Sequence, residues 1–459
     1  MTKKVFFLAL ILCQCLWGQA QNQKDSLTIR RFFDETLTVS ESHNNLRELC
    51  KNIGARLSGS PEAEKAVKWA YAKLKSYGLD TVYLQEVKVP RWERGQVETF
   101  SVNGKSLRAC SLGGSVGTDG VLEGEIIEVR DFEELEKLGK SKIKGKIVFI
   151  NAPLDPKLID TFHAYSACGS YRYRGASNAS EYGAKAVVIR SLASEHDDFP
   201  HTGSMGYAKG AVKIPAMAIS TNDADYLEKQ LRTGTPQKAK MAMDCQTLPD
   251  VTSYNVIAEL KGKRNPERIL LVGGHLDSWD KGEGAHDDGA GVVHSMEAIR
   301  LFKRFGIRPN NTLRCILFMN EENGNRGGET YAKQSTQKGE KHLAALESDR
   351  GGLVPRGFSV DAPQSRFAFL QQQKIEDLLK PYNLHVMRKG YGGVDINPLK
   401  KYGEQTLIGF LPDPQRYFQY HHSDNDVFEN VDRRELELGS ASIASLLYLI
   451  DKYEFGVVN

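Results

Sequence analysis

The chain has 459 residues, of which 40% are hydrophobic and 26% are charged. These proportions are ordinary for a globular protein, and they exclude collagen-like, low-complexity and largely disordered chains. The 61 basic and 58 acidic side chains nearly balance, so the charge predicts no nucleic-acid partner. At roughly 150 residues per domain, the length suggests about three folded units.

The first twenty residues have the pattern of a secretory signal peptide. Lys3 and Lys4 precede an apolar run from Val5 to Trp17, and Gly18 to Ala20 offers small residues for cleavage. A membrane anchor is the alternative, but the run is shorter than the roughly 20 residues that cross a bilayer. We therefore expect a secreted or periplasmic mature chain without a membrane span.

Five cysteines lie after this segment: Cys50, Cys110, Cys168, Cys245 and Cys315. Their scattered spacing does not predict a disulfide framework, although one or two bridges stay open. Cys315 lies in an apolar strand pattern, which predicts a buried thiol.

The remaining chain divides into three regions. Residues 21–105 mix helix and strand patterns, with Ser60 and Pro61 as a helix start and Gly78 as its end. Residues 106–248 contain short apolar runs and turns, which predict a β-rich region. Three histidines of that region lack neighbouring metal-ligand types and are interpreted as surface residues: His163, His196 and His201.

From residue 249 to 459, strand and helix patterns alternate, which predicts an α/β sheet between helical layers. The expected strands cover 255–260, 268–272 and 312–319. The expected helices cover 289–305 and 443–453.

Polar motifs follow these strands, at the sheet edge where α/β proteins bind ligands. His275 and Asp277 come directly after the strand 268–272. Asp277 is placed to accept the second imidazole N–H of His275 and fix its tautomer. Taken alone, this pair is more typical of a structural contact than of a functional site.

Two acidic motifs come next. Asp287 and Asp288 follow a glycine-rich loop, where a carboxylate can bridge two cations or cap the next helix. Glu321 and Glu322 follow a buried strand, where adjacent carboxylates are costly unless cations offset their repulsion. One such carboxylate can bind a metal while its neighbour moves a proton.

The last motifs are Glu347-Ser348-Asp349 and His421-His422-Ser423. Mixed histidine and carboxylate ligands are typical of divalent ions, most often zinc. Two such ions about 3.5–4 Å apart can share a carboxylate and hold a water between them.

In order and context, these motifs resemble the zinc-dependent exopeptidase family that includes leucyl aminopeptidases and glutamate carboxypeptidase. The resemblance covers nearly the whole mature chain. It implies a three-layer α/β/α mixed-sheet catalytic domain in two parts, 21–105 and 249–459. A β-rich domain of the protease-associated type would be inserted between them over 106–248.

The resemblance also implies two Zn²⁺ per chain. One would be held by His275 and Asp349 and the other by Glu322 and His422, with Asp287 bridging them. These roles are carried over from the family's motifs position by position.

Three further residues receive roles from the same resemblance. Glu321 would be the general base that passes a proton from water to the leaving amine, and His421 would contact the reacting carbonyl group. Arg350 departs from the family pattern after the metal-binding aspartate. It can hold a substrate carboxylate or pair with a structural acid.

The implied substrates are dipeptides or small peptides with free termini, and the relatives suggest a homodimer. A single-zinc glutaminyl cyclase and an inert receptor-like binding protein are the alternatives. The complete ligand set, with a bridging-type Asp287, favours two metals. Aminoacylase-like hydrolases carry their insert between the fourth and fifth ligands, whereas here the insert precedes His275. Side-chain preference and the required substrate terminus stay open.

Overall fold

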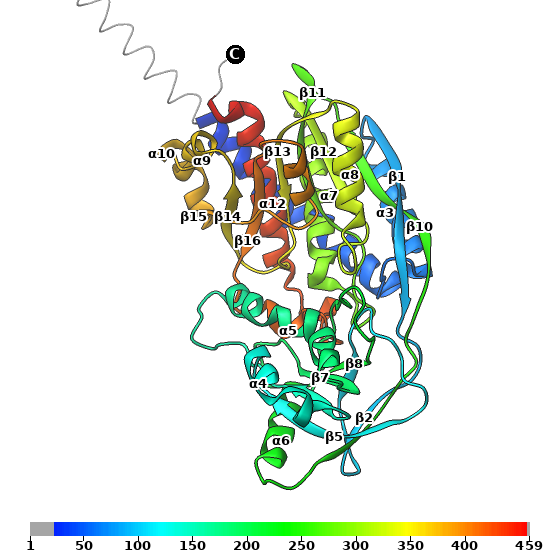
Figure 1. Ribbon diagram of the computed structural model, residues 1–459. Helices are drawn as coiled ribbons and strands as arrows, with labels where there is room; N and C mark the ends of the chain where they lie inside the picture. Colours follow the sequence, from blue (N-terminus) through cyan, green and yellow to red (C-terminus); the bar gives the residue numbers. More distant parts are fainter. Residues whose placement is uncertain (1–22, 457–459) are drawn as a thin grey trace, which may run out of the picture.

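The computed structural model describes residues 23–456. Two eight-stranded sheets occupy separate halves of the molecule (Figure 1). The predicted signal peptide lies outside the described residues. Within residues 23–456, no helix is both long and apolar enough to cross a membrane.

The first sheet has the strand order β1-β10-β12-β11-β13-β16-β14-β15. Its centre is parallel, because β11 runs parallel to both β12 and β13, while β1 and β10 form an antiparallel pair. The bounds are β1 Thr81–Glu93, β10 Gln246–Leu260, β11 Asn265–His275, β12 Asn311–Phe318, β13 Lys341–Glu347, β14 Pro355–Asp361, β15 Val386–Lys389 and β16 Leu407–Pro412.

Helices cover both faces of this sheet. The alternating strand residues divide between two apolar clusters: Leu270 packs in the cluster with α7 and α12, and Leu271 packs in the cluster with Tyr331 of α8. This division is the period-two alternation of a strand buried on both faces. The predicted three-layer α/β/α architecture is therefore confirmed. The helix bounds are α2 Ser42–Glu48, α3 Pro61–Ser76, α7 Ala290–Arg304, α8 Arg326–Gln337, α9 Gln364–Leu370, α10 Gln373–Leu379 and α12 Arg433–Tyr453.

The second sheet has the order β3-β2-β9-β5-β6-β7-β8-β4 and uses residues 98–243. The expected short strands are present, and the helices α4, α5 and α6 lie between them, so the region predicted as β-rich is mixed α/β. The bounds are β2 Glu98–Val102, β3 Lys105–Leu107, β4 Ala109–Ser111, β5 Leu122–Val129, α4 Phe132–Ile143, β6 Ile147–Ile150, α5 Thr161–Glu181, β7 Ala186–Arg190, β8 Ala216–Ile219, α6 Thr221–Leu231 and β9 Lys238–Met243.

We call residues 98–243 the insert segment and propose that they form an inserted domain. The chain enters it after β1 and leaves it into β10, and these two strands pair over nearly their whole length. Since β2 and β3 already belong to the second sheet, we place the first boundary near residue 97 instead of 105.

Local sequence signals account for several elements. The Ser60 hydroxyl accepts a hydrogen bond from the Ala63 N–H at 3.0 Å, and Pro61 opens α3, as predicted. The final helix begins earlier than the expected residue 443, because Asp432 caps it ahead of Arg433. All five described cysteines are buried and free, so no bridge forms among them.

Candidate metal centre

The carboxyl ends of three neighbouring strands carry four of the predicted site residues. His275 ends β11, Glu321 and Glu322 follow β12, and Asp349 follows β13. Because these strands are adjacent and parallel, their carboxyl ends meet at one edge of the sheet. Side chains that are distant in sequence are thereby brought together.

Two loops complete the cluster. Asp287 lies in the turn Ala285–Gly289 that leads into α7. His422 follows the short helix α11 (Tyr417–Tyr420) and has a φ of 64°. This left-handed conformation is uncommon for a residue other than glycine, and such outliers concentrate at functional sites.

The first group of donor atoms joins His275, Asp287 and Asp349. The Nε2 atom of His275 lies 3.2 Å from Oδ1 of Asp287 and 3.4 Å from Oδ1 of Asp349. One donor atom from each of the three residues lies within 4.8 Å of the others. That spacing is compact enough for a single cation.

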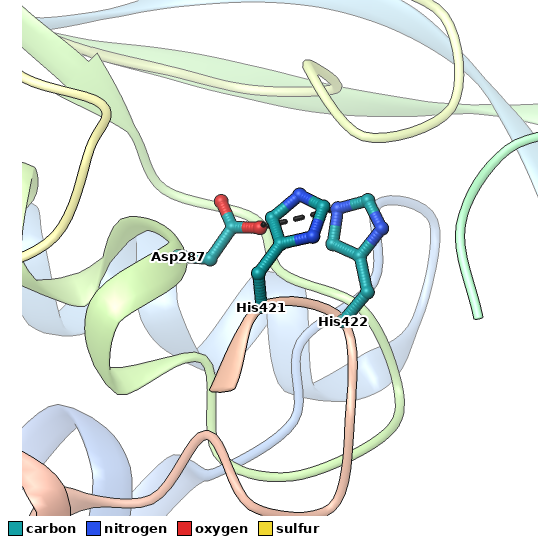
Figure 2. A group of neighbouring side chains, drawn as sticks. All are labelled: Asp287, His421 and His422. Carbon is teal, nitrogen blue, oxygen red and sulfur yellow. Dashed lines mark ion pairs between the residues drawn. The ribbon is translucent and has the colours of Figure 1, made fainter. Parts of the chain in front are cut away.

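The second group uses the other oxygen of Asp287. The Nε2 atom of His422 lies 3.1 Å from Oδ2 of Asp287 and 3.2 Å from Oε2 of Glu322. Figure 2 shows His421 and His422 on the same side of Asp287, with the Nε2 atom of His421 3.5 Å from Oδ2. This buried Oδ2 accepts no hydrogen bond from residues 23–456. Asp287 thus presents one carboxylate oxygen to each group.

The contacts of Asp277 differ from the sequence prediction. Its backbone carbonyl oxygen, at 3.0 Å, accepts the Nδ1–H of His275, while its carboxylate is 3.9 Å from the same nitrogen. The carboxylate instead accepts the backbone N–H groups of Asn320 at 2.7 Å and Glu321 at 3.2 Å. Asp277 therefore orients the imidazole through its main chain and the glutamate loop through its side chain.

Burial, followed by the crowding of like charges, dominates the electrostatics of the cluster. Burial, and then the carboxylates of Asp349 and Asp287, raise the pKa of Glu321 well above its usual range. Burial and Asp287 likewise raise the pKa of Glu322. Although burial opposes it, contact with His275 and His422 holds the pKa of Asp287 well below its usual range. Divalent cations would relieve this repulsion among carboxylates.

A buried arginine that the sequence did not single out fastens the loop between His275 and Asp287. Arg56 is fully buried and donates to the backbone carbonyl groups of Leu276 at 2.6 Å, Glu283 at 2.7 Å and Gly284 at 2.9 Å. The Gly284 carbonyl group also accepts the Gly289 N–H at 3.0 Å, so Arg56 adds a second donor there. Pairing of these backbone carbonyl groups holds the loop in one conformation. Arg56 lies in no recognisable motif. Every residue has a backbone carbonyl group, so the sequence does not show which of them an arginine will contact.

The insert segment holds the loop that carries His422. His201 was predicted as a surface residue, which is wrong: it is 2% exposed. Its Nδ1–H donates to the carbonyl oxygen of His421 at 2.6 Å. The Thr202 N–H donates to the carbonyl oxygen of His422 at 2.8 Å, and Nη1 of Arg172 lies 3.5 Å from Nδ1 of His422. An isolated histidine in a strand-rich region gives no sequence signal for such a long-range contact.

Comparison with known proteins gives a family for this chain. The profile of peptidase family M28 matches residues 255–446. Carboxypeptidase Q of Bos taurus is 34% identical over 419 residues, which cover 90% of this chain and 86% of that protein. Carboxypeptidase Q of Homo sapiens gives the same identity and coverage.

Solved structures agree with these relatives. The crystal structure of a peptidase M28 precursor from Shewanella amazonensis SB2B has a TM-score of 0.89 and 32% identity, covering 94% of this chain and 97% of that one. A zinc aminopeptidase from Bacillus subtilis has a TM-score of 0.65 at 21% identity, covering 90% and 95%, and supports the fold alone. The resemblance seen in the sequence motifs is confirmed, and the chain belongs to peptidase family M28.

Proposed function

We propose that this peptidase is a dizinc exopeptidase that hydrolyses dipeptides or small peptides. The observation that carries the proposal is the position of Asp287, whose two oxygens face two separate groups of donor atoms. One carboxylate between two such groups is the arrangement that a two-metal hydrolase requires.

The donor atoms fit zinc. Imidazole nitrogen and carboxylate oxygen are ligands that Zn²⁺ accepts, and catalytic zinc sites commonly keep three protein ligands. We propose that His275 and Asp349 hold one ion, that Glu322 and His422 hold the other, and that Asp287 is shared. The buried Oδ2 of Asp287, which lacks a hydrogen-bond donor, supports this sharing.

Glu321 is the proposed general base. Bound zinc would lower the pKa of a water molecule and polarise the scissile carbonyl group. Glu321 accepts the proton of the attacking water and returns it to the leaving amine. Asp277 holds the Glu321 backbone in place for this transfer, because its carboxylate accepts the N–H of that residue.

His421 is the proposed donor to the oxyanion that develops on the scissile carbonyl group. Its ring stacks on His422 with centroids 3.4 Å apart, and Tyr165 of the insert segment contacts it edge-on at 5.0 Å. These contacts fix the direction of its N–H. A donor that is already oriented contributes most when charge develops in the transition state.

Metal analysis tests the number of ions. We expect two zinc equivalents per chain after dialysis, and we expect a chelator to abolish hydrolysis and zinc to restore it. Hydrolysis would be assayed with dipeptides whose termini are free, N-blocked or C-blocked. Comparing their rates also shows which free terminus the enzyme requires. One equivalent together with cyclase activity would favour the single-zinc acyltransferase, and zinc-free protein without hydrolysis would favour a receptor-like role.

The contact between His201 and His421 predicts a selective effect on one metal. His201→Gln removes the donor at the Nδ1 position. It is expected to lower the binding affinity for one of the two zinc ions by roughly 10- to 100-fold. His201→Asn places an amide N–H near the same position and is expected to retain most of the affinity. Competition with a chromogenic chelator measures both sites separately.

A purely structural role for His201 has a different signature. It would lower the unfolding temperature of both variants while leaving the two zinc affinities in their wild-type ratio. Wild-type affinity at both sites in His201→Gln would contradict the positioning role.

We further propose that residues 1–20 are a cleaved signal peptide, which places the enzyme outside the cytoplasm, in the periplasm or the medium. The charge pattern of Lys3 and Lys4 before the apolar run supports this location. A homodimer stays a prediction from the family resemblance. Size-exclusion chromatography with light scattering measures it.

A further inference from the structure

A cavity of about 520 Å³ adjoins the candidate metal centre. The two share Asp349, so the cavity begins beside the proposed reacting position. Phe162 and Tyr165, from the start of α5 in the insert segment, line one part of it. Tyr391 and Phe410, from the half of the molecule that holds the first sheet, line another. The cavity is therefore bounded by both halves of the molecule.

Of the two arginines that line this cavity, one forms an ion pair and the other stacks on an aromatic ring. Nη2 of Arg388 forms an ion pair with Oδ2 of Asp160 at 2.9 Å. The guanidinium carbon of Arg350 instead lies 4.5 Å from the ring centroid of Phe162. Among residues 23–456, no carboxylate lies within ion-pair distance of Arg350. From the sequence, an ion pair between Arg350 and a structural acid was one of two alternatives. The described residues contain no such ion pair.

The surroundings of Arg350 favour an external anion. Arg350 is half-buried and follows Asp349 directly in the chain. Withdrawing a cation from water without a partner is costly, and a bound anion would offset that cost. Stacking on Phe162 orients the planar group, whose paired N–H donors match a carboxylate.

We propose that Arg350 binds a carboxylate of the substrate within this cavity. This inference rests on the proposed exopeptidase function and narrows its substrate class. The preferred substrates are peptides whose residue in the cavity carries a carboxylate, either as a free C-terminus or as an acidic side chain.

Two pairs of substrates distinguish these sources, with kcat/KM measured for wild type and Arg350→Met. Alanyl-leucine against its C-terminal amide tests the terminal carboxylate. Alanyl-glutamate amide against alanyl-glutamine amide tests a side-chain carboxylate. We expect wild type to prefer the carboxylate in one pair by roughly 10- to 150-fold and Arg350→Met to lose that preference. No preference in wild type, or an unchanged preference in Arg350→Met, would overturn the proposal.

Arg356→Met is the matched control, because it makes the same substitution at an arginine that does not line this cavity and is already paired with Asp413 at 2.8 Å. It should keep the wild-type ratio within each pair. Thermal unfolding of both variants shows whether either has lost its fold.

Binding without turnover keeps the inference separate from the proposed function. Calorimetric titration of L-leucine and L-leucinamide, and of L-glutamine amide and L-glutamate amide, compares a carboxylate with its neutral counterpart. We expect wild type to bind the carboxylate form of one pair more tightly, and Arg350→Met to bind both forms equally. If wild type hydrolyses no peptide, the proposed function fails while this comparison still decides the role of Arg350. Equal binding of both forms by wild type in both pairs would overturn it.

Discussion

Glu321→Gln is expected to lower kcat for peptide hydrolysis by roughly 10²- to 10⁴-fold while the protein keeps both zinc equivalents. The amide has nearly the shape of the carboxylate but cannot accept a proton from water. Its backbone N–H still reaches the carboxylate of Asp277, so the loop should stay in place. Steady-state kinetics with a zinc determination on the same sample measures both quantities.

The adjacent residue provides the matched control. Glu322→Gln changes the same group one position along the chain, where Oε2 lies 3.2 Å from Nε2 of His422. It should lose zinc as well as turnover, since an amide is a weaker ligand than a carboxylate. Near-wild-type turnover in Glu321→Gln would rule out the proposed proton transfer, and zinc loss in that variant would make Glu321 a ligand.

Asp287→Ala is expected to have the largest effect on metal content. The substitution removes the oxygens that face His275 at 3.2 Å and His422 at 3.1 Å, so both groups lose a donor at once. Zinc should fall from two equivalents to below one after dialysis. Hydrolysis should fall by roughly 10⁴-fold or more, because transition-state stabilisation worth several kcal/mol is lost with the ions.

Asp424→Asn controls for the general loss of an acidic residue near the site. Asp424 lies two residues after His422 but is exposed. Its carboxylate pairs with Lys281 at 3.0 Å and accepts the Gly282 N–H at 3.4 Å. Exposed pairs contribute about 0–1 kcal/mol, so zinc content and turnover should stay unchanged. Retention of two tightly bound zinc ions by Asp287→Ala would show that this residue does not bridge them.

Much of the fold could be read from the sequence because its signals are local. Apolar runs predicted the central strands, and motifs placed directly after them predicted which side chains meet at the sheet edge. The position of His275 at the end of β11 follows from that reasoning. The grouping of five proposed ligand residues also relied on the family resemblance, since each short motif by itself has a structural interpretation.

The residues that the sequence did not predict depend on tertiary contacts. Arg56 and His201 donate to backbone carbonyl groups, and any residue type can supply such an acceptor. Asp277 stands where a carboxylate partner for His275 is expected, yet its main chain makes the closer contact. Such choices between main chain and side chain depend on loop conformation, which short-range patterns do not specify.

The order of strands in the first sheet has a consequence for how the protein is made. β1 pairs with β10, and the whole insert segment lies between them in the chain. The second sheet draws all its strands from that contiguous segment, so each of its pairings closes a shorter loop than the β1–β10 pair does, and we expect them to form before that pair. His422, near the C-terminus, then arrives at a surface that already presents His201 and Thr202. The growing chain would thus build the anchor for His422, its last proposed metal ligand, well before that residue is synthesised.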